Sequence, residues 1–394
     1  MNRRMARSIA DIRIHPISVP LERAFWMSLE PYTVAAEIVV EIETDDGLVG
    51  IGEIHGRPQG EIVGILESAF KPLLIGEDSV DHERLWDALF RLTFSRAAAR
   101  FGAADGQPHF GAGAKPQMMA AIAGIDIALW DIKAQAAGLP LYKLLGGHRT
   151  SVPAYASGGY YGPDGEADTE SLVAEMTGYA ELGYKAVKMK VGGLALEEDV
   201  ARVRAVREAL PDVGIMLDAN SAYDVTAAIE AAHAFEPIDI YWLEEPTAWF
   251  DPVFGLARVG AATTIPLASG EREPHRFGCR DLVDHTPIRF LQFDCTRAGG
   301  VTEWLRVAAY ASAHGVLMAP HHDPQIHGHL LVAVPNGHIQ EVFPNPVRDP
   351  LWSRLFVEQP QVLDGELVLG EAPGLGVTLD RDVLEHYSTK VAVI

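Results

Sequence analysis

Eight short runs of β-branched and apolar residues alternate with amphipathic helical stretches between residues 152 and 342. Each run is followed by a helix or a short connection, and repeating β–α units of this kind predict a parallel sheet. Such alternation fits either a closed barrel or an open doubly wound sheet. Eight units with no glycine-rich phosphate loop after the first strand favour the barrel. The predicted strands are residues 152–157, 185–190, 214–218, 240–244, 266–270, 290–294, 316–320 and 338–342.

The first third of the chain has a mixed α+β pattern. Two strands are predicted over 12–19 and 35–43, followed by a Thr-Asp-Asp-Gly turn at 44–47. Helices are predicted near 61–74, 81–94 and 116–137, and a mobile Gly/Ala-rich loop over 97–114. We therefore expect an α+β domain over 1–140, a barrel domain over 141–355, and a C-terminal segment over 356–394. Short strands within 361–377 should return that segment to the first domain.

The charge of the chain argues against two classes of partner. Its 394 residues include 32 Lys and Arg against 54 Asp and Glu, a formal net charge of −22. No excess of cations exists to replace counterions on nucleic acid or to dock on anionic lipid. No run reaches the roughly 18 apolar residues of a membrane span, and no apolar core follows the basic start as in a secretory signal. With only Cys279 and Cys295, a cytoplasmic protein without a disulfide scaffold is expected.

Ionisable residues recur where successive predicted strands end. They are spaced by 20 to 28 residues, which is about one β–α unit each. Because the carboxyl ends of barrel strands meet at one mouth, where barrel active sites are built, these side chains should converge there. The residues are Lys188, Lys190, Asp218, Glu244, Glu271, Asp294, His321 and Glu341.

Three of these residues form a candidate metal site. Asp218, Glu244 and Glu271 end three neighbouring strands and have no Cys or His beside them. An all-oxygen set of this kind suits Mg²⁺ better than Zn²⁺ and leaves positions open for a carboxylate with an adjacent hydroxyl. Asn220 follows Asp218 by two residues and either adds a hydrogen bond to ligand or substrate or serves as a helix cap or loop amide.

The remaining residues suit proton transfer. Lys188 and Lys190 are two apart on one strand, so both face the same way. Two ammonium groups at the barrel interior should lower each other's pKa and prepare one as a general base; the alternative is a solvated pair. Asp294 would orient His321 from the next strand, and Glu341 would donate a proton if burial raises its pKa.

The His-rich stretch at 321–329 is compatible with a second metal site. Most of it lies on the predicted helix after the seventh strand, so capping and packing roles are the favoured interpretation.

The ordered set of motifs resembles the enolase superfamily and, within it, the mandelate racemase subgroup. The resemblance covers nearly the whole chain, including the Thr44–Gly47 turn and the following Gly-Ile-Gly-Glu at 50–53. The motifs are Lys-Met-Lys at 188–190, Leu-Asp-Ala-Asn at 217–220, Leu-Glu-Glu-Pro at 243–246, Ser-Gly-Glu at 269–271, Asp294 with Arg-Ala-Gly-Gly-Val at 297–301, Met-Ala-Pro-His at 318–321, and Glu341.

The resemblance implies a modified (β/α)₇β TIM-type barrel with an N-terminal α+β capping domain, and one Mg²⁺ on Asp218, Glu244 and Glu271. Lys190 would be the base on one face of the substrate and Lys188 would contact its carboxylate. His321, paired with Asp294, would be the acid/base on the other face. The family pattern also makes Glu341 the electrophilic acid and places a cationic residue at Arg297. A symmetric homo-oligomer, often an octamer, is implied as well.

The step that this family shares is removal of a proton next to a carboxylate, giving an enediolate. Members with this Lys and His–Asp pattern are mostly sugar-acid dehydratases, so we favour dehydration of an aldonate or aldarate to a 2-keto-3-deoxy acid. A racemase or epimerase of a 2-hydroxy acid uses the same enediolate. A sugar-acid binding protein that kept the fold and a Schiff-base aldolase acting through Lys190 are the other hypotheses. No lysine ends the sixth strand, which disfavours the dipeptide-epimerase and muconate-cycloisomerase pattern.

Loops of the capping domain should select the small carboxylate substrate. Trp26, Tyr32, His55 and Arg57 are the candidates there, with Asn220 and Arg297 from the barrel. Lid residues of this kind exclude water and contact the distal part of the substrate. The alternative for the capping-loop residues is ordinary packing between the domains.

Overall fold

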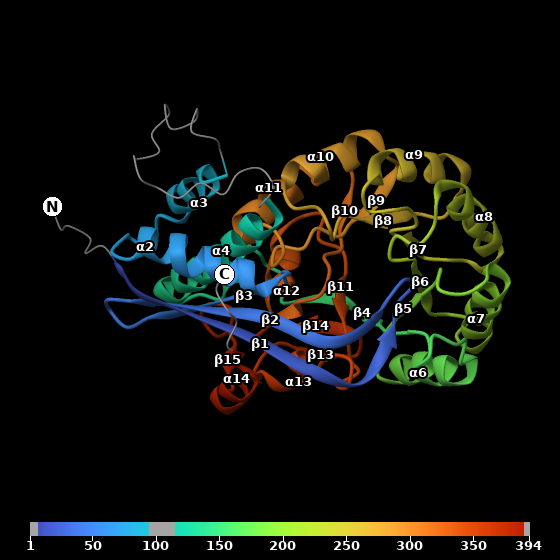
Figure 1. The fold of residues 1–394 in the computed structure, drawn as a ribbon, viewed down its shortest axis with the longest axis horizontal. Helices are drawn as coiled ribbons and strands as arrows, with labels where there is room; N and C mark the ends of the chain where they lie inside the picture. Colours follow the sequence, from blue (N-terminus) through green and yellow to red (C-terminus); the bar gives the residue numbers. More distant parts are fainter. Residues whose placement is uncertain (1–6, 94–114, 390–394) are drawn as a thin grey trace.

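The computed structural model describes residues 7–93 and 115–389, and at its centre is a closed ring of eight parallel strands (Figure 1). The strands from β4 to β10 pair in sequence order, and β11 pairs in parallel with β4. A parallel bridge between Met318 and Gly337 joins β10 to the chain that leads into β11. The barrel prediction is therefore confirmed. The strands are β4 (Ser151–Ser157), β5 (Ala186–Lys190), β6 (Gly214–Asp218), β7 (Trp242–Glu244), β8 (Leu267–Ser269), β9 (Ile288–Leu291), β10 (Leu317–Met318) and β11 (Gln340–Val342).

Seven helices follow the first seven strands and cover the outside of the barrel, which makes it a (β/α)₇β barrel. Their apolar faces pack on the outward side chains of the strands, while aromatic residues such as Tyr155, Trp242 and Phe290 fill the interior. The helices are α6 (Thr169–Glu181), α7 (Leu196–Ala209), α8 (Val225–Phe235), α9 (Pro252–Ala262), α10 (Arg276–His285), α11 (Gly300–Ala313) and α12 (Pro324–Ala333), with the shorter α5 (Leu141–Leu144), η4 (Glu236–Ile238) and α13 (Pro350–Arg354).

The N-terminal part is a three-stranded antiparallel sheet covered by helices. Its strands are β1 (Ile9–Trp26), β2 (Pro31–Thr44) and β3 (Val49–Ile54), and Figure 1 shows the long β1–β2 arm reaching toward the barrel. The helices are α1 (Gln59–Ile65), the π-helix η1 (Leu66–Phe70), α2 (Lys71–Leu74), α3 (His82–Arg91) and α4 (Lys115–Ala137). The predicted loop at 97–114 lies outside the described residues.

Helix α4 lies against β3 so closely that glycine is required at the contact. A Cβ on Gly52 would stand 1.9 Å from the carbonyl oxygen of Gly124. The same helix also ties this sheet to the barrel, because Asp126 accepts hydrogen bonds from the backbone N–H and hydroxyl of Thr302 on α11, at 2.8 and 2.7 Å. Trp130 donates to the Thr302 hydroxyl at 2.8 Å.

The C-terminal segment contacts both parts of the molecule. The hairpin of β13 (Gln361–Leu363) and β14 (Glu366–Val368) extends the barrel sheet, because β14 pairs antiparallel with β4. The expectation that residues 361–377 return to the first domain is therefore wrong for this hairpin. Contact with the N-terminal sheet comes further along, from β12 (Phe356–Glu358) paired with β15 (Thr378–Leu379) and from α14 (Arg381–Tyr387), which lie beside β1.

No helix among the described residues is both long enough and apolar enough to cross a bilayer.

Candidate active site

A cavity of about 340 Å³ opens where the carboxyl ends of the barrel strands face the N-terminal sheet. The strand register brings the predicted residues together there, since Lys190, Asp218 and Glu244 occupy one row across β5, β6 and β7. Lys188 also lies on β5, and the other predicted residues come from the loops after their strands or from β11 itself. Those lining the cavity are Lys188, Lys190, Asp218, Glu271, His321 and Glu341.

Both lysines are buried and held by carboxylates. The Nζ of Lys188 lies 2.8 Å from Glu244 and 2.7 Å from Glu341, and the Nζ of Lys190 lies 2.5 Å from Asp218. Burial alone would lower the pKa of each lysine, but these carboxylates outweigh it and raise both pKa values, that of Lys188 strongly. Lys188 does lower the pKa of Lys190, as expected, but the expected net lowering of the pKa is wrong for this arrangement. The facing carboxylates carry more weight than the like charge two residues away.

The three predicted metal ligands offer only oxygen donors. Burial, together with the nearby Asp218 charge, raises the pKa of Glu244 well above its usual value, as expected where carboxylates crowd together out of water. The side-chain oxygen of Asn220 beside them is buried without a hydrogen-bond partner. Hard carboxylate and amide oxygen donors fit a divalent cation such as Mg²⁺.

Each of the three carboxylates pairs with a cationic side chain in this arrangement: Asp218 with Lys190, Glu244 with Lys188, and Glu271 with Arg297 at 3.1 Å. The oxygens of these three carboxylates do not all lie within 4.8 Å of one another. Two groups in the described parts of the chain do so, and both include members of the His-rich stretch. The first is Glu37, His55, His322 and Asp323, and the second is Asp294, Asp323 and His327.

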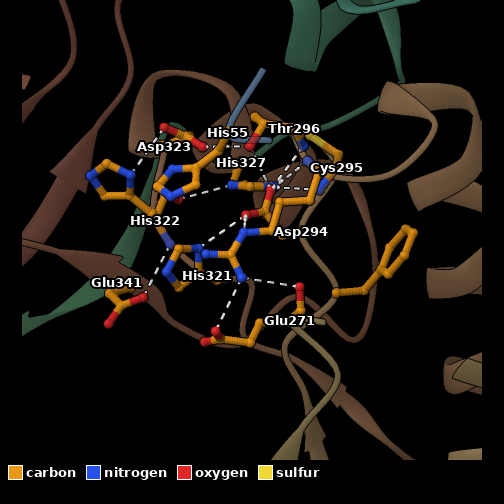
Figure 2. Close-up of polar contacts among 12 residues, drawn as sticks. His55, Glu271, Asp294, Cys295, Thr296, His321, His322, Asp323, His327 and Glu341 are labelled. Atoms are coloured by element: carbon orange, nitrogen blue, oxygen red, sulfur yellow. Dashed lines mark hydrogen bonds and ion pairs between the residues drawn. The ribbon is translucent and has the colours of Figure 1, made fainter. Parts of the chain in front are cut away.

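A carboxylate–imidazole pair lies on the other side of the mouth (Figure 2). His321 Nδ1 lies 3.0 Å from Asp294 Oδ2. The other oxygen of Asp294 accepts from the backbone N–H and hydroxyl of Thr296, at 2.8 and 2.7 Å. Burial works against ionisation of Asp294, but His321 and the neighbouring His327 and Arg297 outweigh it and hold its pKa far below the usual range. Asp294 is thus an ionised, rigidly held partner for the imidazole.

Glu341 differs from its prediction. One of its oxygens contacts Lys188 and the other accepts from the backbone N–H of His322 at 3.1 Å. Burial would raise its pKa, yet the Lys188 ammonium and His321 outweigh burial and lower the pKa to about 2. Glu341 is therefore a carboxylate in this arrangement, and the expectation of a proton donor with a raised pKa is wrong for it.

Five of the six predicted specificity residues line the cavity: Tyr32, His55, Arg57, Asn220 and Arg297. Trp26 does not. Its indole N–H donates to the carbonyl oxygen of Pro163 at 2.7 Å, so the ring packs on the loop after β4.

The polar cavity residues that sequence reasoning missed include Glu37, His322, Arg348 and Asp349. His322 Nε2 lies 2.6 Å from Asp349, which makes a second carboxylate–imidazole pair next to His321. Glu37 carried one signal, a lone acid within the apolar stretch of β2. Arg348 and Asp349 follow the last barrel strand in a segment without periodicity, where no sequence signal marked them.

Comparison with known proteins assigns the chain to a family. Residues 9–146 match the family "Mandelate racemase / muconate lactonizing enzyme, N-terminal domain", and residues 171–383 match the family "Enolase C-terminal domain-like". The chain therefore belongs to the mandelate racemase/muconate lactonizing enzyme family of the enolase superfamily.

Its relatives carry out more than one reaction. Arabinonate dehydratase of Saccharolobus solfataricus is 33% identical over 363 residues, covering 90% of this chain and 91% of the relative. D-galactarolactone cycloisomerase of Agrobacterium fabrum is 32% identical over 400 residues, covering 96% and 98%. The structure of L-talarate/galactarate dehydratase from Salmonella typhimurium, liganded with Mg and L-lyxarohydroxamate, superposes with a TM-score of 0.84 at 31% identity, covering 99% of this chain and 96% of that one.

Proposed function

We propose that the protein is an Mg²⁺-dependent dehydratase that converts a sugar acid, an aldonate or aldarate, to a 2-keto-3-deoxy acid. The observation that carries this proposal is that two different proton-transfer groups face one cavity from well-separated strands. Lys190 ends β5 and His321 follows β10, three strands away around the ring in one direction and five in the other. A substrate between them exposes one face to each group, as removal of a proton and departure of a hydroxyl require.

The roles follow from the contacts. Lys190, in its neutral amine form, removes the proton next to the substrate carboxylate, and Lys188, held between Glu244 and Glu341, offers positive charge to that carboxylate. His321, with its Nδ1 fixed by Asp294, gives a proton from Nε2 to the departing hydroxyl. Asp218, Glu244 and Glu271 would hold Mg²⁺, which supplies a Lewis acid that stabilises negative charge on carboxylate oxygens.

Reversal of configuration at the same carbon is the second candidate. A racemase or epimerase needs the same two opposed groups, with His321 returning a proton to carbon rather than to a hydroxyl. The activities for which the relatives are named favour dehydration, although one of them is a cycloisomerase. A binding protein has no need of opposed proton-transfer groups, and a Schiff-base enzyme has no need of three clustered carboxylates.

The proposal is tested by incubating the protein and Mg²⁺ with a panel of mono- and dicarboxylic sugar acids and measuring 2-keto acid formation. We expect turnover of one stereochemical series, lost in Lys190→Ala and in His321→Asn. Lys185→Ala is the matched control, because Lys185 lies just before the same strand but is exposed. A panel that yields only inverted substrates would establish the racemase. A stable borohydride adduct at Lys190 would establish the Schiff-base route.

We further propose that residues 1–140 shape the specificity side of the pocket, 141–355 carry the chemistry and 356–394 brace the two. Cys279 and Cys295 are both buried free thiols, which suits the cytoplasm, where we place the enzyme. We also propose a homo-oligomer, as the family resemblance implies, and sedimentation of the purified chain tests this.

A further inference from the structure

The cations that line the cavity fall into two groups. Lys188, Lys190, Arg272 and Arg297 each have a carboxylate within 4.0 Å. The two remaining cationic side chains among the described lining residues, Arg57 and Arg348, have none at that distance. In a chain with a formal charge of −22, cations left without a carboxylate beside a cavity call for an explanation.

Arg348 is held in place by aromatic rings rather than by acids. Its guanidinium carbon lies 3.9 Å from the ring centre of Tyr32 and 4.5 Å from that of Phe343. Its Nε donates to the Tyr160 hydroxyl at 2.7 Å. The two terminal nitrogens have no acceptor among the described residues and are not buried, so they open on the cavity. A guanidinium held in this way presents a fixed fork of donors, the geometry that matches a carboxylate.

Arg57 lies on the same tyrosine at the exposed rim of the cavity. Its guanidinium carbon is 5.7 Å from the Tyr32 ring centre, and one terminal nitrogen donates to the carbonyl oxygen of Val34 at 3.2 Å. Two guanidinium groups therefore pack on Tyr32, and neither has a carboxylate partner among the described residues. Together they make this end of the cavity suited to an anion.

The nearby acids do not pair directly with these two guanidinium groups, although Asp349 contributes some negative charge beside Arg348. Asp349 contacts His322 at 2.6 Å and accepts from the backbone N–H of Trp352 at 3.1 Å. Burial, reinforced by Asp323, raises the pKa of Glu37 well above its usual value and so disfavours its charged form. Glu30 is exposed at the turn between β1 and β2.

The distance from the proposed base fits a short chain molecule. The Tyr160 ring centre lies 5.5 Å from Lys190 Nζ and 5.2 Å from the guanidinium carbon of Arg348. The ammonium and the guanidinium are therefore no more than about 11 Å apart, the sum of those two distances. Since each carbon of an extended chain adds roughly 1.2 Å, an acid of about six carbons reaches from one group to the other.

We propose that Arg348, assisted by Arg57, binds a second carboxylate at the far end of the substrate, so that the enzyme acts on sugar dicarboxylates in preference to sugar monocarboxylates. This inference rests on the proposed dehydratase function and narrows its substrate class. The relatives do not decide between monocarboxylates and dicarboxylates, because they include an arabinonate dehydratase and a galactarate dehydratase.

Kinetics on matched substrates test the preference. For each stereochemical series, kcat/KM is measured with the hexarate and with the hexonate that carries a primary alcohol in place of the far carboxylate. We expect the hexarate to be favoured by about 100-fold or more, as for a site whose charged donors lose their partner in the analogue. Arg348→Met should abolish most of that preference by slowing the hexarate alone, and Arg348→Lys should keep part of it. Arg354→Met is the control, because Arg354 is exposed on the same segment.

Equal use of hexonates and hexarates, or an equal effect of Arg348→Met on both, would overturn the dicarboxylate inference and leave the dehydratase intact. No turnover of any sugar acid would overturn the dehydratase instead. Calorimetric binding of adipate and hexanoate to the Mg²⁺-loaded protein tests the carboxylate site separately from the dehydratase activity, since neither ligand reacts. We expect adipate to bind at least about tenfold more tightly, a difference that Arg348→Met removes. Equal binding of the two acids to the wild-type protein would contradict the carboxylate site.

Discussion

Asp294→Asn tests how the carboxylate acts on His321. The two side chains are 3.0 Å apart, and both oxygens of Asp294 are already committed to His321 and Thr296. The substitution keeps the shape of the side chain but removes its charge. An amide nitrogen facing Nδ1 would donate rather than accept, so the doubly protonated imidazolium that gives its proton from Nε2 would lose its partner.

The size of the effect follows from the geometry. Two unit charges about 4 Å apart interact by about 4 kcal/mol at an effective dielectric constant of 20. If that energy is lost where His321 must carry a proton, the step slows by roughly 10³-fold. Removal of the α-proton by Lys190 does not use this pair, so its rate should change by less than about tenfold.

Two rates measured on the same variant separate these steps. Dehydration is followed by 2-keto acid formation, and α-proton removal by ¹H NMR exchange of the substrate in D₂O. Glu41→Gln is the matched control, because it removes the same kind of charge from a buried carboxylate 2.9 Å from His15, away from the cavity. If Asp294→Asn slowed exchange as much as dehydration, or left both unchanged, the assignment of His321 and Lys190 to separate steps would be refuted.

Three further outcomes are expected. Excess chelator should abolish turnover and lower the unfolding temperature, and added Mg²⁺ should restore both; in Asp218→Asn the unfolding temperature should respond little to Mg²⁺. Burial raises the pKa of Asp126 to about 7, so its contribution to stability is complete below about pH 4 and is lost as the pH rises through 7. Chemical denaturation should therefore show the free energy of unfolding of Asp126→Asn rising by about 2 to 3 kcal/mol relative to wild type between pH 5 and pH 8. A difference between the two proteins that does not change with pH would contradict this reasoning. Gly52→Ala places a Cβ against the carbonyl oxygen of Gly124 and should cost about 1 to 3 kcal/mol in a denaturant titration, where an unchanged midpoint would show that α4 can shift.

The barrel and the mouth of its site were predictable because both depend on local repetition. Strand-sized apolar runs recur at a regular interval, and a polar residue where a parallel strand ends must lie at one edge of the sheet. Lys190, Asp218 and Glu244 are an example, since the β5–β6–β7 register places them in one row. The first two strands of the N-terminal sheet and the turn after them were predictable for similar reasons, from strand-sized apolar runs and the Thr-Asp-Asp-Gly signal.

Features that depend on contacts between distant segments were not predictable. Arg348 reaches the cavity from an irregular segment, and only its packing on Tyr32 and Phe343 shows its importance. The pKa directions of Lys188 and Glu341 depended on their charged neighbours: Glu244 and then Glu341 raise the pKa of Lys188, and Lys188 lowers that of Glu341. The pairing of β14 with β4 joins residues more than two hundred positions apart, with no signal in either short strand.

The central claim is that Lys190 and His321 act on opposite faces of one sugar acid to remove water. The most direct measurement is ¹H and ¹³C NMR of the product formed in D₂O from the preferred substrate by the Mg²⁺-loaded wild-type enzyme. The proposed mechanism predicts a 2-keto-3-deoxy acid with solvent deuterium at carbon 3, formed by wild type and not by Lys190→Ala. Recovery of only substrate and its epimer, deuterated at carbon 2, would contradict dehydration and establish the racemase in its place.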